Sequence, residues 1–215
     1  PILISDVVVG GTKNVLDYAR VKRIKRVLFI SSGAIYGKQP TDLMHIPEDY
    51  TSAPDTLNPL NAYGCAKRQA ENLCALYHLH CGIEYVVARG FAFVGPYMPL
   101  DAHFAIGNFI RDGLNGGPIV VKGDGTTIRS YLFADDLAEW LWTILIKGKT
   151  GEAYNVGSDW AITISDLAHL VKNCFNSKLE VIIEENLGVD VDRYVPRVKK
   201  IKIELGVSER VSLFE

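Results

Sequence analysis

The clearest chemical signal in the sequence is a tyrosine and a lysine, Tyr63 and Lys67, within the segment Ala62–Cys81. A spacing of four residues places both side chains on one face of a helix. A lysine ammonium beside a phenol stabilises the phenolate, which makes such a tyrosine usable as a general base near neutral pH. A second pair, Tyr18 and Lys22, has the same spacing, so the spacing alone does not identify a site.

A serine hydroxyl distinguishes the first pair from the second. Ser32 follows Val27–Ile30, a short apolar run that predicts a buried strand. A side chain at the carboxyl end of a strand faces the ligand crevice of an α/β sheet. We therefore expect Ser32 to bind the substrate oxygen that Tyr63 deprotonates. The alternative for Ser32 is a turn serine that satisfies local backbone groups.

These side chains need strands and helices that alternate along the chain, and the apolar pattern predicts them. Alternation of this kind favours an α/β fold with a mostly parallel sheet over a bundle or a sandwich. Helices are predicted at Val9–Arg20, Ala62–Cys81, Ala105–Leu114, Leu137–Ile146 and Ser165–Phe175, with Asp135 as an N-cap. Strands are predicted at Val27–Ile30, Tyr85–Ala88, Ile119–Val121, Tyr131–Phe133, Tyr154–Val156 and Leu179–Ile183.

Composition excludes several classes of protein. With 215 residues, 48% hydrophobic and 22% charged, the chain can bury a real core, so it is not a disordered or collagen-like chain. A net charge of −2 argues against a nucleic-acid partner. The four cysteines lack zinc-ligand spacing, which predicts no metal site and fits a reducing, cytoplasmic compartment. The apolar run Leu137–Ile146 is too short to cross a membrane, so no membrane partner is predicted.

Several ordered stretches carry a family resemblance. They are Val9–Ala19, Val27–Gly37 (VLFISSGAIYG), Asn61–Glu71 (NAYGCAKRQAE), Val87–Pro96 (VARGFAFVGP), Val121–Ala138, Gly151–Gly157 (GEAYNVG) and Arg193–Gly206. In these stretches the chain resembles the extended short-chain dehydrogenases/reductases, in particular the nucleotide-sugar epimerase/dehydratase group. The resemblance implies a partial Rossmann-type, doubly wound parallel sheet and a smaller C-terminal α/β part that binds substrate. It places the NAD-binding domain at 1–95 and mainly sugar-nucleotide binding at 96–215, with the chain returning to the first part in places.

The resemblance also assigns roles to residues. Ser32, Tyr63 and Lys67 would be catalytic, and hydride would pass between a sugar carbon and NAD, with NADP as the alternative cofactor. Cofactor contacts would come from the same Tyr63 and Lys67 together with Ser31, Arg89 and Phe91. The diphosphate of a nucleotide sugar would bind Arg129 and Arg193, because a guanidinium grips phosphate oxygens with two donors.

Some residues depart from the family pattern, and they reduce the number of reactions expected of this chain. The dehydratases of this family carry an Asp-Glu pair where this chain has Gly33 and Ala34, so dehydration of that type is set aside. Ala92, Ser130 and Arg197 also replace the family's usual asparagine and two aspartates. These three substitutions bear on which substrate the chain binds more than on its fold. An epimerase or ketoreductase is the expectation.

The sequence contains no GxxGxxG turn, the element that receives the cofactor pyrophosphate in this family. We therefore expect an N-terminally incomplete chain. The same absence supports an alternative from another class, a non-catalytic remnant or subunit that binds a sugar nucleotide or a partner without redox chemistry. Two predicted helices, Val9–Arg20 and Ala62–Cys81, resemble the helices that pair across the family's dimer interface, which predicts a homodimer.

Overall fold

A parallel sheet of three strands, in the order β1-β2-β7, carries the predicted catalytic residue Ser32 at the end of its first strand. The computed structural model describes residues 1–102, 104–175, 178–184 and 191–215. The strands are β1 (Arg26–Ser32), β2 (Glu84–Gly90) and β7 (Ala153–Val156). Ser32 pairs with Gly90 across the first two strands. Helices cover both faces of this sheet and bury Val86 and Ala88 of the central strand, whereas Ile30 of the edge strand β1 is exposed.

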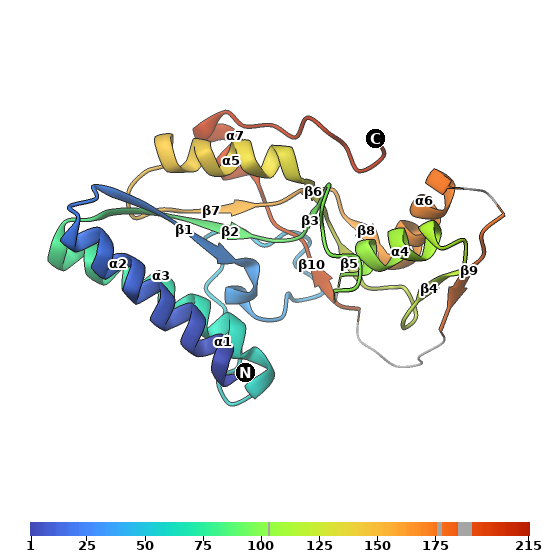
Figure 1. Ribbon diagram of the computed structural model, residues 1–215, viewed down its shortest axis with the longest axis horizontal. Coiled ribbons are helices and arrows are strands. Elements are labelled where there is room, and N and C mark those ends of the chain that lie inside the picture. The colour runs from blue at the N-terminus through green and yellow to red at the C-terminus, as the bar shows by residue number, and fades with distance from the viewer. Residues whose placement is uncertain (103, 176–177, 185–190) are drawn as a thin grey trace.

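Helices lie on both sides of the sheet (Figure 1). On one side, α1 (Ile2–Ser5), the π-helical turn η1 (Asp6–Gly10) and α2 (Gly11–Val21) continue as one helix, because the junction residues all have right-handed helical backbone. This long helix packs against α3 (Ala62–Cys81), which contacts β1 and β2. The opposite side carries α5 (Ala134–Lys147) and α7 (Lys199–Leu205).

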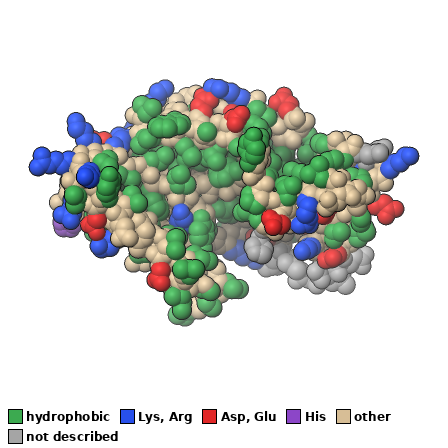
Figure 2. All heavy atoms as spheres, viewed as in Figure 1, with side chains coloured by type: hydrophobic (Ala, Val, Ile, Leu, Met, Phe, Trp, Pro, Cys, Tyr) green, Lys and Arg blue, Asp and Glu red, His purple; other side chains and the backbone are tan. Residues whose placement is uncertain are grey.

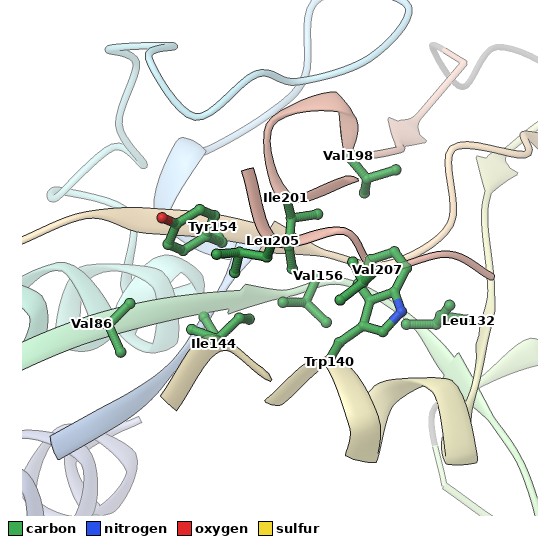
Figure 3. Packing of buried hydrophobic residues seen from close by; sticks show 11 residues of the cluster. Val86, Leu132, Trp140, Ile144, Tyr154, Val156, Val198, Ile201, Leu205 and Val207 are labelled. Atoms are coloured by element: carbon green, nitrogen blue, oxygen red, sulfur yellow. The ribbon is translucent and has the colours of Figure 1, made fainter. Parts of the chain in front are cut away.

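The core beneath α5 and α7 draws on distant parts of the sequence (Figure 3). Trp140 and Ile144 of α5 are fully buried, and the Trp140 indole N–H donates to the Ser208 carbonyl at 3.2 Å. Their neighbours come from the sheet, from the short strand β6 (Leu132–Phe133), and from α7 with the residues that flank it: Val86, Ala88, Leu132, Tyr154, Val156, Val198, Ile201, Leu205 and Val207. The C-terminal segment therefore completes the same core as β2.

A second cluster of buried residues lies farther along the chain, under α4 (Ala105–Leu114) and α6 (Ile164–Phe175). These helices pack on β4 (Ile119–Val121), which pairs in parallel with β9 (Val181–Ile183). Short strands lie between the two clusters (Figure 1). They are β3 (Phe93–Val94), β5 (Ile128–Arg129), β6 (Leu132–Phe133), β8 (Ile162–Thr163) and β10 (Arg193–Tyr194), paired as β3-β6 and β10-β5-β8.

The structure confirms the α/β class with parallel strands. The helices 62–81 and 105–114 begin and end where the pattern predicts. The prediction of Asp135 as N-cap was wrong: Phe133 holds the cap position and Asp135 lies in the first turn, where a carboxylate favours the positive end of the helix. The domain boundary near residue 95 stays a prediction. Within the described residues, the structure contains no helix with the length and apolar character needed to cross a bilayer.

Candidate active site

Ser32 ends β1 in extended backbone conformation and caps the short 3-10 helix η2 (Gly33–Tyr36). Its Oγ accepts the backbone N–H of Ala34 at 3.2 Å. This is the local turn contact that the sequence offers as the alternative role for Ser32. It uses one acceptor lone pair of the hydroxyl, and the proton is left for another partner.

Tyr63 and Lys67 lie on the first two turns of α3, next to the end of β1. The helix follows the 3-10 turn η3 (Pro59–Asn61), which is capped by Asn58. A Cβ atom at position 64 would lie only 2.5 Å from the Ala34 carbonyl oxygen. Glycine at this position therefore lets α3 approach η2 closely, which brings Tyr63 into the neighbourhood of Ser32.

The Lys67 ammonium joins the tyrosine to the strand. Its Nζ lies 5.7 Å from the centroid of the Tyr63 ring and donates to the Ile30 carbonyl at 2.8 Å. Burial lowers the pKa of Lys67. Tyr63 is 42% exposed, so its ring is accessible to a ligand. Among the described residues β1 pairs only with β2, which leaves this edge of the sheet open beside Lys67.

Arg89, which the resemblance placed at the cofactor, has its guanidinium in a polar network. Two of its nitrogens donate to the Glu71 carboxylate, Nη2 at 2.8 Å and Nε at 3.1 Å. Nη1 donates to the Tyr36 hydroxyl at 2.9 Å and to the Glu48 carbonyl at 3.0 Å. Burial raises the pKa of Tyr36 to about 12. In this arrangement Arg89 joins β2 to α3, and its predicted cofactor contact is untested.

Ser31 and Phe91, the other two predicted cofactor contacts, lie at the ends of β1 and β2. The Ser31 Oγ is buried and has no hydrogen-bond partner within the described ranges of the chain. The Phe91 ring packs 4.6 Å, between centroids, from the ring of Tyr194. A buried hydroxyl without a partner is costly, so the Ser31 Oγ suits a polar ligand atom.

The two predicted phosphate ligands lie on adjacent strands. Arg129 of β5 donates through Nη2 to the Asp192 carboxylate at 2.6 Å and through Nη1 to the Ile128 carbonyl at 2.9 Å. Within the described part of the chain, Arg193 of β10 makes a 3.5 Å contact with the Met44 carbonyl. A phosphate at Arg129 would compete with Asp192 for the same planar donors.

Sequence reasoning missed Tyr194, which lies between the two groups. Its hydroxyl is 3.4 Å from the Ser32 Oγ, and its ring lies 6.0 Å from the Arg129 guanidinium carbon. Burial raises the pKa of Tyr194 to about 12. The one available signal was its place beside Arg193 in a stretch that already carried the resemblance.

The sheet, the serine at the end of β1 and the Tyr–Lys face of α3 define a Rossmann-type protein of the short-chain dehydrogenase/reductase class. Residues 1–157 match the model of the NAD dependent epimerase/dehydratase family. The chain belongs to that family, which confirms the resemblance drawn from its motifs.

Individual relatives agree with this assignment. The chain is 33% identical over 207 residues to UDP-glucuronic acid decarboxylase 5 of Arabidopsis thaliana, covering 95% of this chain and 59% of the relative. It thus spans about three fifths of that protein. It superposes on UDP-glucose 4-epimerase of Thermotoga maritima with a TM-score of 0.88 and 25% identity, covering 98% of this chain and 67% of the other. UDP-glucuronic acid 4-epimerase of Bacillus cereus shares the fold, with a TM-score of 0.81, 24% identity and coverage of 96% and 63%.

Proposed function

We propose that the protein works as an NAD-dependent epimerase or ketoreductase on a nucleotide-diphosphate sugar. The observation that carries the proposal is that Tyr63, Lys67 and the end of β1 lie together. The Lys67 ammonium contacts both the Tyr63 ring and the Ile30 carbonyl. This gives an accessible phenol, a neighbouring ammonium and the Ser32 hydroxyl at one sheet edge. A base, a cation and a hydrogen-bond donor are what proton transfer from an alcohol needs.

The residues present fit the nicotinamide-ribose end of NAD. The buried Ser31 Oγ, which has no hydrogen-bond partner among the residues that the structure describes, and the Lys67 ammonium at the open edge of β1 both suit hydroxyl or amide oxygens. NAD supplies the capacity to take up a hydride from the sugar carbon and to return it. Lys67 would hold the ribose and stabilise the Tyr63 phenolate.

Tyr63 and Ser32 would act on the sugar itself. While the sugar alcohol is oxidised to a carbonyl, the Tyr63 phenolate would take the hydroxyl proton. Ser32 would donate a hydrogen bond to that oxygen. In an epimerase the carbonyl would be reduced again on its other face, and Tyr63 would return the proton to the sugar oxygen. A ketoreductase would use only the second half.

The diphosphate and nucleotide of the substrate are assigned to the second part of the chain. Arg129 offers the fork that phosphate oxygens match, with Arg193 on the next strand. The relatives named above are described as enzymes of UDP-sugars, which supports a UDP-sugar here. Gly33 and Ala34 supply no acid for the elimination of water, so dehydration is not proposed.

A second candidate is a sugar-nucleotide-binding unit without redox activity. The two candidates differ in NAD binding, for which the sequence contains no GxxGxxG turn. Titration with NADH, followed by energy transfer from the tryptophans, separates the two. Saturable binding at micromolar concentration supports the enzyme, and conversion of UDP-glucose or UDP-glucuronic acid with NAD is then assayed. Binding of UDP-sugar without binding of NADH, in a sample shown by circular dichroism to be folded, would favour the second candidate.

We also infer a homodimer formed by the long N-terminal helix and α3. Leu3, Val7, Val15 and Tyr18 share one stripe of that helix and are all exposed. Figure 2 shows hydrophobic side chains gathered at the tip of the molecule where α1 lies in Figure 1. A face of this kind is typical of an interaction site.

A further inference from the structure

Tyr194 is fixed between the two groups that the proposed function uses. Its strand, β10, pairs with β5, so that Tyr194 lies opposite Arg129. The Phe91 ring packs against it on the side of the sheet. Pairing of β10 with β5 and packing on the Phe91 ring therefore hold the Tyr194 hydroxyl beside the end of β1.

Two acceptors compete for the Tyr194 proton. The hydroxyl lies 3.4 Å from the Ser32 Oγ and 3.4 Å from the Gly90 carbonyl oxygen. Both separations exceed the ~2.8 Å of a typical hydroxyl hydrogen bond, as catalytic hydrogen bonds often do without a ligand. Because burial raises the pKa of Tyr194 to about 12, the phenol keeps its proton near neutral pH.

Glycine at position 33 makes room for this phenol. A Cβ atom there would lie 2.6 Å from the Tyr194 hydroxyl oxygen and 2.7 Å from the Phe91 ring. Any larger residue would have to displace one of the two rings. Gly33 and Tyr194 thus form a matched pair beside the catalytic hydroxyl.

The direction of the hydrogen bond between Tyr194 and Ser32 decides whether Ser32 can donate its own proton to a ligand. A serine hydroxyl has one proton and two acceptor lone pairs. The Ala34 N–H occupies one lone pair. If Tyr194 donates to the second, the Ser32 proton is free for a ligand. If Ser32 instead donates to Tyr194, which then donates to Gly90, that proton is used up.

We propose that Tyr194 is a positioning residue that donates to Ser32 and so holds the serine as a hydrogen-bond donor toward the substrate sugar oxygen. This inference rests on the proposed function. It assigns Tyr194 a role that acts through Ser32 and not through direct contact with the reacting carbon. The role depends on the phenol hydroxyl, while the packing on Phe91 depends on the ring.

The test is a double-mutant cycle in binding. The affinities of UDP-glucose and of UDP, in the presence of NAD, are measured by calorimetry for the full chain and for Tyr194→Phe, Ser32→Ala and the double variant. Tyr194→Phe keeps the ring and should weaken UDP-glucose binding about threefold to tenfold, the worth of one hydrogen bond. It should have no effect in the Ser32→Ala background, and UDP, which lacks the glucosyl group, should bind all four proteins equally.

Several results would overturn the proposal. They are an unchanged affinity in Tyr194→Phe, an equal loss in the Ser32→Ala background, or an equal loss for UDP. A wild-type protein that binds neither ligand would overturn the proposed function, and this role with it. Wild-type binding combined with a silent Tyr194→Phe would overturn the positioning role alone.

A measurement without ligand examines the contact directly. With ¹³Cζ-labelled tyrosine, the Tyr194 resonance is assigned by its loss in Tyr194→Phe. Ser32→Ala should shift that resonance, and so should Gly33→Ala, which displaces the phenol without removing it. A Tyr194 resonance that stays in place in both variants would show that no such hydrogen bond forms.

Discussion

Glu71 lies one turn beyond Lys67 on α3, and its carboxylate accepts two hydrogen bonds from the guanidinium of Arg89 on β2. Because Tyr63, Lys67 and Glu71 are spaced by four residues, they share one helix face. The ion pair therefore fixes the rotation of α3 about its axis relative to the sheet. That rotation decides whether the tyrosine and lysine face the end of β1.

Glu71→Gln should destabilise the fold by about 3 kcal/mol, because it leaves the Arg89 cation buried without its counter-charge. Both side chains are only 15% exposed, so water cannot replace the lost partner. Urea unfolding of the full chain measures the change. Glu139→Gln is the control, since Glu139 pairs with Arg210 at the exposed surface and should change stability little. Equal losses in the two variants would contradict this account.

Gly64→Ala should push α3 away from η2, because the added Cβ would meet the Ala34 carbonyl oxygen at 2.5 Å. We expect a loss of about 1–3 kcal/mol in the free energy of unfolding, as for other overpacked sites. Gly11→Ala is a matched control in α2, where an added Cβ meets nothing within 4 Å. That change should stabilise the helix by about 0.5–1 kcal/mol. The result that supports this account is a lower free energy of unfolding in Gly64→Ala together with a higher one in Gly11→Ala.

The positions of Ser32, Tyr63 and Lys67 in the fold could be predicted from the sequence because each depends on local geometry, while their catalytic roles stay a prediction. Ser32 ends an apolar strand, and Tyr63 and Lys67 follow the helical period, so their positions need no knowledge of distant contacts. Tyr194 could not be found in this way. It lies 162 residues from Ser32, and the contact arises from pairing between the two-residue strands β5 and β10, which are too short to show a period.

Charged residues show the same limit. Arg129 and Arg89 look alike in the sequence, as arginines at strand ends. The structure pairs the first with Asp192 and the second with Glu71, and neither partner follows from spacing. Asp135 shows that a prediction from local sequence can also fail. The sequence predicts Asp135 as the N-cap of α5, but the helix begins at Ala134, so the cap position lies two residues earlier, at Phe133.

Glu48 should make stability depend on pH. Burial raises its pKa above the ordinary value of 4.5, although the Asn155 N–H, 2.9 Å from Oε1, opposes the shift. The folded chain then binds more protons than the unfolded chain in the window just above 4.5, so this contribution to stability falls as pH rises through that window.

The variant Glu48→Gln keeps an oxygen for Asn155 and removes the titration. The free energy of unfolding is measured for both proteins from about pH 4 to about pH 7. The advantage of the variant over the wild type should grow with pH across the window. An advantage that shrinks as pH rises would mean that the carboxylate is stabilised in the fold.

The proposed homodimer predicts a molar mass of two chains by light scattering. Val7→Glu places a charge in the exposed apolar stripe of the N-terminal helix, where a buried interface would have no partner for it, and should yield monomers. Ile203→Glu is the control, because Ile203 is equally exposed but lies on α7 across the sheet. A wild-type monomer at micromolar concentration, or dissociation by both variants, would contradict the predicted interface.

Tyr63→Phe tests the proposed chemistry most directly. Phenylalanine keeps the ring beside Lys67 but has no oxygen to accept the sugar proton, so kcat for conversion of the UDP-sugar should fall about 10²–10⁴-fold. Affinity for the nucleotide sugar should change little, because Arg129 and Arg193 are untouched. Tyr18→Phe is the matched control: Lys22 lies 6.0 Å from the Tyr18 ring with the same spacing, yet on the exposed outer helix. If the two variants retain the same kcat, Tyr63 is not the base.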